Sequence, residues 1–152
     1  MTSEAILIVG YKIDAQAYND IEILQQKIED YIKSKLNDKQ QHSFKYRDYD
    51  NFNTDNKPVL FFVNRVYDSI DMHDYGIYLA YNYLDLGTYG NVIKSEKLIK
   101  LAETKSQTVD DNINDILEKL NLKIMGNFNI FSDCYDSDRT FDIYDLSEFI
   151  HC

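Results

Sequence analysis

Residues 59–67 read VLFFVNRVY and residues 76–86 read GIYLAYNYLDL, and these two runs decide the fold of the chain. Both are rich in β-branched and aromatic residues, which favour strands, and Pro58 stands at the first position of a strand, where proline is tolerated. One polar turn, residues 68–74, separates the two runs. The pattern predicts a hairpin in which residues 59–67 pair antiparallel with residues 76–86.

Other strands and helices are predicted on both sides of this hairpin. Residues 5–12 are apolar on both faces, which is typical of a central strand, and residues 122–130 alternate apolar with polar side chains, which predicts a half-buried strand. Apolar residues at helical spacing predict helices over residues 14–37, from Ser95 through Ala102, and from a capping box at Thr108 through Leu120.

The remaining segments are polar and carry weaker patterns. Residues 37–57 read as a long loop with an edge strand at 43–49. Residues 132–152 are acidic, with a short strand at 141–144 and a turn of helix at 146–150. The element order predicts a single α+β domain over residues 1–152. We expect an antiparallel or mixed sheet with helices on one face, a ferredoxin-like β-α-β-β-α-β order and an acidic C-terminal extension.

The charge balance narrows the classes of partner. The chain has 152 residues with 16 Lys and Arg against 26 Asp and Glu, a formal net charge of -10. Nucleic acids and anionic membranes bind proteins through Lys and Arg, so direct binding to nucleic acid or membrane is disfavoured. We expect a partner with a basic protein surface, such as a nuclease or a nucleic-acid-binding effector.

The sequence also bears on compartment and source. Its start carries Glu4 and no basic segment, and its cysteines are Cys134 and Cys152, so we expect a cytoplasmic protein with free thiols. Abundant Asn, Ile, Lys and Tyr are associated with AT-rich genomes, such as those of low-GC bacteria, their phages or large viruses. For a phage or viral protein the compartment would be the host cytoplasm.

The negative charge is unevenly distributed along the chain. Residues 46–91 carry 3 basic and 7 acidic groups, and residues 124–152 carry 1 and 6, so these two segments hold -9 of the net charge. Aspartate alternates there with tyrosine, which is enriched at interface centres. We therefore predict a partner-binding surface formed by Asp68, Asp71, Asp74, Asp133, Asp136 and Asp138, with Tyr75 and Tyr135 as anchors. The alternative is that Asp here forms turns and keeps the protein soluble.

No complete catalytic motif occurs in the sequence. The chain lacks a glycine-rich phosphate loop, and Asp136-Ser-Asp138-Arg-Thr140 comes too near the C-terminus to open a long β/α array. Asp71, His73 and Asp74, next to Asp68, are weak candidates for a metal site, because no second His or Glu cluster completes it. We expect no cofactor and no bound metal.

These observations lead to three hypotheses. The first is a non-enzymatic acidic binding protein of the inhibitor, immunity or phage anti-defence type, whose carboxylates mimic the phosphates of a nucleic acid. The second is a metal-dependent enzyme or a small-ligand-binding ferredoxin-like domain using the 68–74 turn. The third is a structural module that forms a homodimer through an exposed strand edge or an aromatic sheet face.

Overall fold

The computed structural model describes residues 3–36, 44–47, 56–65, 75–87, 92–136 and 140–149. Its elements follow one another as β1 (Ser3–Asp14), α1 (Ile21–Lys35), β2 (Lys45–Arg47), β3 (Val59–Asn64), β4 (Tyr75–Gly87), α2 (Ser95–Ala102), α3 (Asp111–Lys119), β5 (Lys123–Asp136), β6 (Phe141–Asp145) and a 3₁₀ turn at Ser147–Phe149. The fold is α+β, and in the described residues no helix combines the length and apolar character needed to cross a membrane.

The strands form one six-stranded sheet in the order β2-β6-β3-β4-β1-β5, with every neighbouring pair antiparallel. The predicted hairpin is confirmed, because β3 pairs with β4 from Val59 opposite Ala80 to Asn64 opposite Tyr75. The predicted edge strand at 43–49 is present as the shorter β2. The predicted strands at 5–12 and 122–130 are also present, and both extend further than the sequence indicated.

One aspect of the predicted fold is not confirmed, and another needs correction. The six-stranded order is not that of a four-stranded ferredoxin-like sheet, so a ferredoxin-like arrangement is not confirmed. The C-terminal segment is no extension, because β6 lies inside the sheet between β2 and β3 and its Phe141 and Ile143 are buried. The short strand predicted at 141–144 is present as β6, and Asp142 is buried in it together with its apolar neighbours.

Helix α2 has the predicted bounds, whereas α1 and α3 begin later than periodicity suggested. Strand β1 continues to Asp14, and α1 starts only at Ile21, where Asp20 caps it by accepting a hydrogen bond from the backbone N–H of Glu22 at 2.8 Å. In the same way α3 is capped by Asp110 rather than by Thr108. In each case an Asp side chain satisfies one of the free N–H groups of the first turn.

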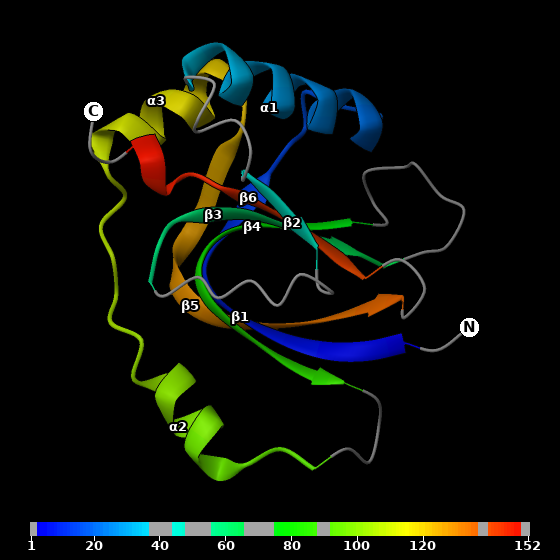
Figure 1. Cartoon of the computed structure of the whole chain (residues 1–152), viewed down its shortest axis with the longest axis vertical. Helices are drawn as coiled ribbons and strands as arrows, with labels where there is room; N and C mark the ends of the chain where they lie inside the picture. Colours follow the sequence, from blue (N-terminus) through cyan, green and yellow to red (C-terminus); the bar gives the residue numbers. More distant parts are fainter. Residues whose placement is uncertain are drawn as a thin grey trace.

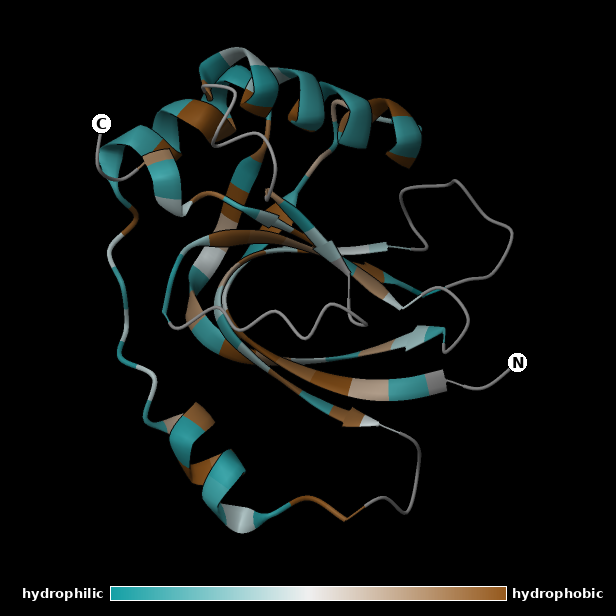
Figure 2. Ribbon diagram, in the orientation of Figure 1, coloured by the Kyte–Doolittle hydropathy of each residue, from teal (hydrophilic) through white to brown (hydrophobic). Residues whose placement is uncertain are grey.

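Helices α1 and α3 cover the outer side of the sheet (Figure 1). The stripe Ile21, Leu24, Ile28 and Ile32 of α1 meets Leu60 and Phe62 of β3 and the buried face of α3 in a cluster that we call the outer core. Hydrophilic residues cover the sides of these helices that face away from the sheet (Figure 2). Helix α2 lies apart from them and buries only Leu101.

The sheet bends back on itself like a letter U (Figure 1). Ladder register shifts in β1 between Val9 and Gly10 and between Gly10 and Lys12 accompany the bend. Gly10 is required there, because a Cβ atom at this position would collide with the backbone carbonyl of Leu79. One arm of the U carries β3 and β6, and the other carries the first half of β1 and the second half of β5.

A second apolar cluster, the inner core, fills the space between the two arms. Its buried members are Ile6, Ile8, Val59, Phe61, Val63, Tyr78, Ala80, Tyr135, Phe141 and Ile143. The rings of Tyr135 in β5 and Phe141 in β6 pack edge to face with centroids 5.4 Å apart, although three strands separate β5 from β6 in the sheet. Strand β3 therefore contributes alternate side chains to both cores.

Candidate functional site

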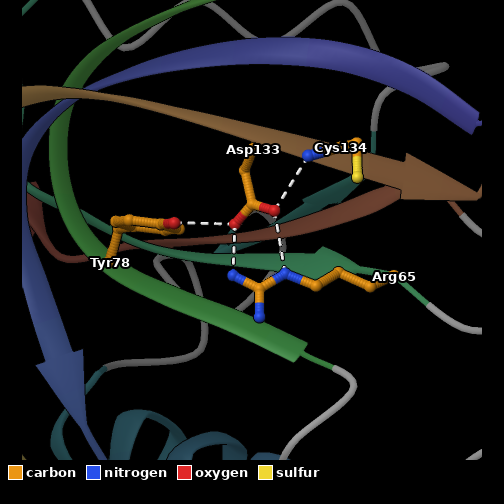
Figure 3. A network of polar contacts seen from close by, with 4 residues as sticks. All are labelled: Arg65, Tyr78, Asp133 and Cys134. Atoms are coloured by element: carbon orange, nitrogen blue, oxygen red, sulfur yellow. Dashed lines mark hydrogen bonds and ion pairs between the residues drawn. The ribbon is translucent and has the colours of Figure 1, made fainter.

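An ion pair between Arg65 and Asp133 joins the two arms of the sheet (Figure 3). Arg65 directly follows β3, and Asp133 lies in the second half of β5. The guanidinium donates through Nε to Oδ1 at 2.8 Å and through Nη2 to Oδ2 at 2.6 Å, the bidentate geometry that makes Arg–carboxylate pairs strong and directional. The Asp133 side chain is 5% exposed and that of Arg65 is 32% exposed.

Two further donors complete the surroundings of the Asp133 carboxylate. The Tyr78 hydroxyl donates to Oδ2 at 2.6 Å, and the backbone N–H of Cys134 donates to Oδ1 at 2.8 Å. Each carboxylate oxygen thus accepts two hydrogen bonds, so the buried charge is well compensated. We call Arg65, Tyr78 and Asp133 the clasp.

The clasp fixes the protonation state of its members. Burial by itself raises the pKa of Asp133, but the hydrogen bonds from Arg65 and Tyr78 and the guanidinium charge outweigh it, so the pKa lies below its usual range. Burial and the neighbouring carboxylate raise the pKa of Tyr78. At neutral pH the clasp therefore contains a carboxylate, a guanidinium and a neutral phenol.

The clasp depends on a residue that has no side chain. Gly76 in β4 packs so closely against it that a Cβ atom there would collide with Oδ2 of Asp133 and lie 2.8 Å from Nη2 of Arg65. A glycine inside a strand often marks such a close approach. The sequence shows Gly76 at the start of the predicted strand, but it does not show that a glycine is needed there because the clasp lies so close.

A cleft of about 670 Å³ opens beside the clasp. Residues that line it include Lys12, Tyr18, Asn19, Arg65, Tyr75 and Met125. Two cationic side chains, Lys12 and Arg65, thus border the same hollow, together with the carboxylate of Asp14. The size and mixed polarity of the cleft are compatible with a small polar ligand.

A second polar network lies further along the inner side of the sheet. The buried Tyr135 hydroxyl is 2.6 Å from Oε2 of Glu4 and 2.7 Å from both carboxylate oxygens of Asp85. Burial raises the pKa of Tyr135, and the hydrogen bonds and charges of the two carboxylates raise it further. Unlike the clasp, this network contains no ion pair in the described part of the chain.

The structure places four of the predicted partner-binding residues inside the protein. Tyr75, Tyr135 and Asp136 are buried, with Tyr135 and Asp136 each only 1% exposed, and Asp133 belongs to the clasp. The other four, together with His73, lie outside the described residues: Asp68, Asp71, Asp74 and Asp138. The role of these eight residues in partner binding stays a prediction.

Sequence reasoning missed Arg65 and Tyr78. Arg65 is one of three arginines, with Arg47 and Arg139, and it directly follows a fully buried strand, a position that could have suggested an internal ion pair. Nothing in the sequence linked Arg65 to Asp133, because 68 residues separate them.

No three His, Cys, Asp or Glu side chains gather into a possible metal site within the ranges given above, and the weak metal candidates Asp71, His73 and Asp74 lie outside those ranges. Cys134 is an exposed free thiol, and because successive side chains of a strand point to opposite faces, it lies on the other face of β5 from Asp133. Comparisons with protein-family models, curated proteins and solved structures find no significant match to this chain.

Proposed function

We propose that the chain is a non-enzymatic acidic binding protein that occupies a basic surface of a partner protein. The net charge of -10, concentrated in residues 46–91 and 124–152, supports this function, because such a field steers a basic partner toward one region. A surface that normally holds nucleic-acid phosphates, as in a nuclease or nucleic-acid-binding effector, would accept carboxylates in their place. The protein would then act as an inhibitor, immunity protein or anti-defence factor.

The structure narrows which carboxylates are available for this role. Asp133 is neutralised by Arg65, while Asp136 and Asp142 are buried, so none of the three can lead recognition without rearrangement. The acidic residues of the β3–β4 connection, Asp68, Asp71 and Asp74, remain as the centre of the proposed surface.

The position of the clasp is the observation that carries this proposal. Asn64 and Tyr75 face each other across β3 and β4, so the connection over residues 66–74 starts and ends at neighbouring points of the sheet. Arg65, the residue immediately before it, is held by Asp133 through two hydrogen bonds. An acidic segment whose attachment point on the sheet is held in place loses less conformational entropy on binding than a segment with a mobile attachment point.

A charge-matched comparison tests the proposal. The first variant replaces Asp68, Asp71 and Asp74 with Asn, and the control replaces the exposed helix residues Glu22, Asp30 and Asp115 with Gln, Asn and Asn. Both lose the same charge. We expect the control and the unmodified chain to capture the same protein from a lysate of the source cells, with affinity falling as salt rises, and the first variant to lose it. Equal capture by both variants would contradict the assignment of the surface.

The cleft beside the clasp favours a second candidate, a small-ligand-binding domain with a ferredoxin-like central unit. Strands β3, β4, β1 and β5 lie side by side in that order, and helices occur in the β1–β3 and β4–β5 connections, which supports such a unit. Lys12 and Arg65 suit an anionic ligand.

Thermal unfolding with inorganic phosphate or succinate tests this candidate. Stabilisation of the unmodified chain that disappears in Lys12→Gln would support it, and no stabilisation would count against it. The same thermal unfolding measurement with Mn²⁺, comparing the unmodified chain with Asp71→Ala and His73→Ala, tests the hypothesis of a metal-dependent enzyme.

A further inference from the structure

A second cleft, of about 810 Å³, lies between the second half of β4 and the segment that contains α2. Residues 82–85 form one side of it, and residues between Lys97 and Gln107 form the other. We call it the α2 cleft. It shares no lining residue with the cleft beside the clasp, and its volume is typical of a site for a small molecule.

Helix α2 directs lysines rather than apolar side chains toward this cleft. Leu101 is the buried residue of the helix, and Lys97, one turn earlier on the same face, lines the cleft together with Lys100. Ile99, by contrast, is 56% exposed. An amphipathic helix on a sheet usually turns its apolar side chains inward and its charged side chains outward. Apolar packing therefore does not explain why lysines line this cleft.

Polar contacts hold the segment after α2 against the sheet. Nδ2 of Asn82 in β4 donates to Oγ1 of Thr104 at 3.0 Å, and the Tyr11 hydroxyl in β1 donates to the backbone C=O of Gln107 at 2.6 Å. Thr104 and Gln107 both line the cleft. One wall of the cleft is thus fixed to the other before any ligand binds, which lowers the entropy cost of binding.

The side of the cleft formed by β4 suits a small molecule better than an added strand. The β3–β4 ladder ends before residues 82–87, and no described strand replaces β3 there. Two backbone N–H groups of this stretch already donate to side chains, that of Tyr83 to Oδ1 of Asn82 at 2.8 Å and that of Gly87 to Oδ1 of Asp85 at 2.9 Å. An incoming strand would have to compete with these hydrogen bonds.

The charge of the α2 cleft is opposite to that of the whole chain. Residues 92–107 contain four lysines and two glutamates, a net charge of +2, whereas the chain carries -10. Three lysines line the cleft, and none of them forms an ion pair with another described residue, since the ion pairs there are Lys45–Glu29 and Arg65–Asp133. The cleft is also lined by two carboxylates, so cations are in excess. An anion between the lysines would relieve their mutual repulsion.

We propose that the α2 cleft binds a small molecule that carries a diphosphate group, held by Lys97, Lys100 and Lys105. Lysine binds phosphate as a point charge, and a diphosphate offers several charged oxygen atoms to three such groups. Free pyrophosphate and a nucleoside diphosphate share this chemistry. In the second, the carboxylate of Glu103 would accept hydrogen bonds from sugar hydroxyls. The lysines take the place of the glycine-rich phosphate loop that the sequence lacks.

Isothermal titration calorimetry at constant ionic strength tests the site with pyrophosphate, ADP and succinate. We expect both diphosphates to bind, and succinate to bind more weakly. In the double variant Lys97→Gln with Lys100→Gln, diphosphate binding should be about ten-fold weaker or more. The control, Lys94→Gln with Lys123→Gln, loses the same charge outside the cleft and should bind like the unmodified chain.

The outcomes of the titration separate the possible ligands. Tighter binding of ADP than of pyrophosphate supports a nucleotide, and equal binding supports the diphosphate group alone. Three results would overturn the proposal: no binding of either diphosphate, equal weakening in both double variants, or succinate binding as tight as that of pyrophosphate.

Chemical protection tests the location in the unmodified chain, where no variant has to fold. The protein is acetylated with acetic anhydride, with and without pyrophosphate, and mass spectrometry measures the modification of each lysine. We expect pyrophosphate to protect Lys97, Lys100 and Lys105 and to leave Lys94 unchanged, because Lys94 does not line the cleft. Protection of Lys12 instead would place the diphosphate in the cleft beside the clasp and overturn the assignment.

Discussion

The two polar networks on the inner side of the sheet compensate the charge of their carboxylates in different ways. In the clasp, the Asp133 carboxylate is matched by the Arg65 guanidinium and satisfied by four hydrogen bonds. In the second network, the single Tyr135 hydroxyl contacts two carboxylates, those of Glu4 and Asp85. The hydroxyl has one proton to donate, and the backbone N–H of Gly87 donates a second hydrogen bond, to Oδ1 of Asp85 at 2.9 Å. The two carboxylates of this network therefore receive fewer donors than the one carboxylate of the clasp. Stability should depend on the clasp through charge pairing and on the second network through a single phenol.

Removing one partner of the clasp should cause the largest loss of folding stability. Asp133→Ala leaves the Arg65 guanidinium without its counter-charge, and we expect a loss of about 2–3 kcal/mol in the free energy of unfolding. This is below the roughly 3–5 kcal/mol typical of fully buried pairs, because Arg65 is 32% exposed. Urea unfolding measures the loss. The double variant Asp133→Leu with Arg65→Met should recover most of it, and a double variant less stable than Asp133→Ala would contradict the charge argument.

Adding a side chain at Gly76 should reduce folding stability somewhat less, because it disturbs the same clasp without removing its ion pair. In Gly76→Ala the new methyl group collides with the Asp133 carboxylate, and such overpacking costs about 1–3 kcal/mol. Combining Gly76→Ala with Asp133→Ala should cost less than the two separate losses added together, since the second change removes the clash. Strict additivity in urea unfolding would show that Gly76 acts independently of the clasp.

A comparison of the two tyrosines distinguishes the network with more donors from the network with fewer. Tyr78→Phe leaves Asp133 with three donated hydrogen bonds, so we expect a loss of about 1 kcal/mol. Tyr135→Phe removes the one hydroxyl shared by Glu4 and Asp85, and we expect about 2 kcal/mol. Parallel thermal and urea unfolding give both values. The reverse order would mean that the two carboxylates find other donors.

The pH dependence of stability should distinguish Tyr135 from Asp133, and we expect these effects to be the smallest. The pKa of Tyr135 is raised above its ordinary value of 10.0, so its contribution is present below pH 10 and is lost as the pH rises further. The pKa of Asp133 lies below its ordinary value of 3.8, so its contribution is present above that pH and is lost as the pH falls below it. Tyr135→Phe should therefore flatten the alkaline limb, and Asp133→Asn the acid limb, of stability measured against pH. A variant that flattens the opposite limb would contradict this assignment.

Local pattern was enough to predict the hairpin, the stripe of α1 and the positions of most strands. The run VLFFVN is apolar on both faces, and the stripe Ile21, Leu24, Ile28 and Ile32 recurs at the helical period, so neighbouring residues alone define these elements. Element ends were predicted less well, because β1 continues as far as its partner strands do, and the sequence of β1 does not contain that information.

The candidate site was predicted only in part. Asp133 and Tyr135 were singled out from the sequence as exposed contributors to a partner surface, and the structure places their side chains on the inner side of a bent sheet. Arg65 and Gly76 were not recognised, since their importance comes from contact with β5, a strand far away in the sequence.

The sequence by itself determined the α+β class, the β3–β4 pairing and the strong negative charge, because composition and hydrophobic period act over a few neighbouring residues. Only the tertiary structure decided that the C-terminal segment enters the sheet between β2 and β3 and that the sheet bends until β5 contacts β3. It also decided that the Asp133 carboxylate forms an ion pair with Arg65. The physical reason is that the sequence gives the formal charge of an Asp side chain but does not show whether that side chain is solvated or buried. Its partners are set by the chain path, which strand order and register shifts define together.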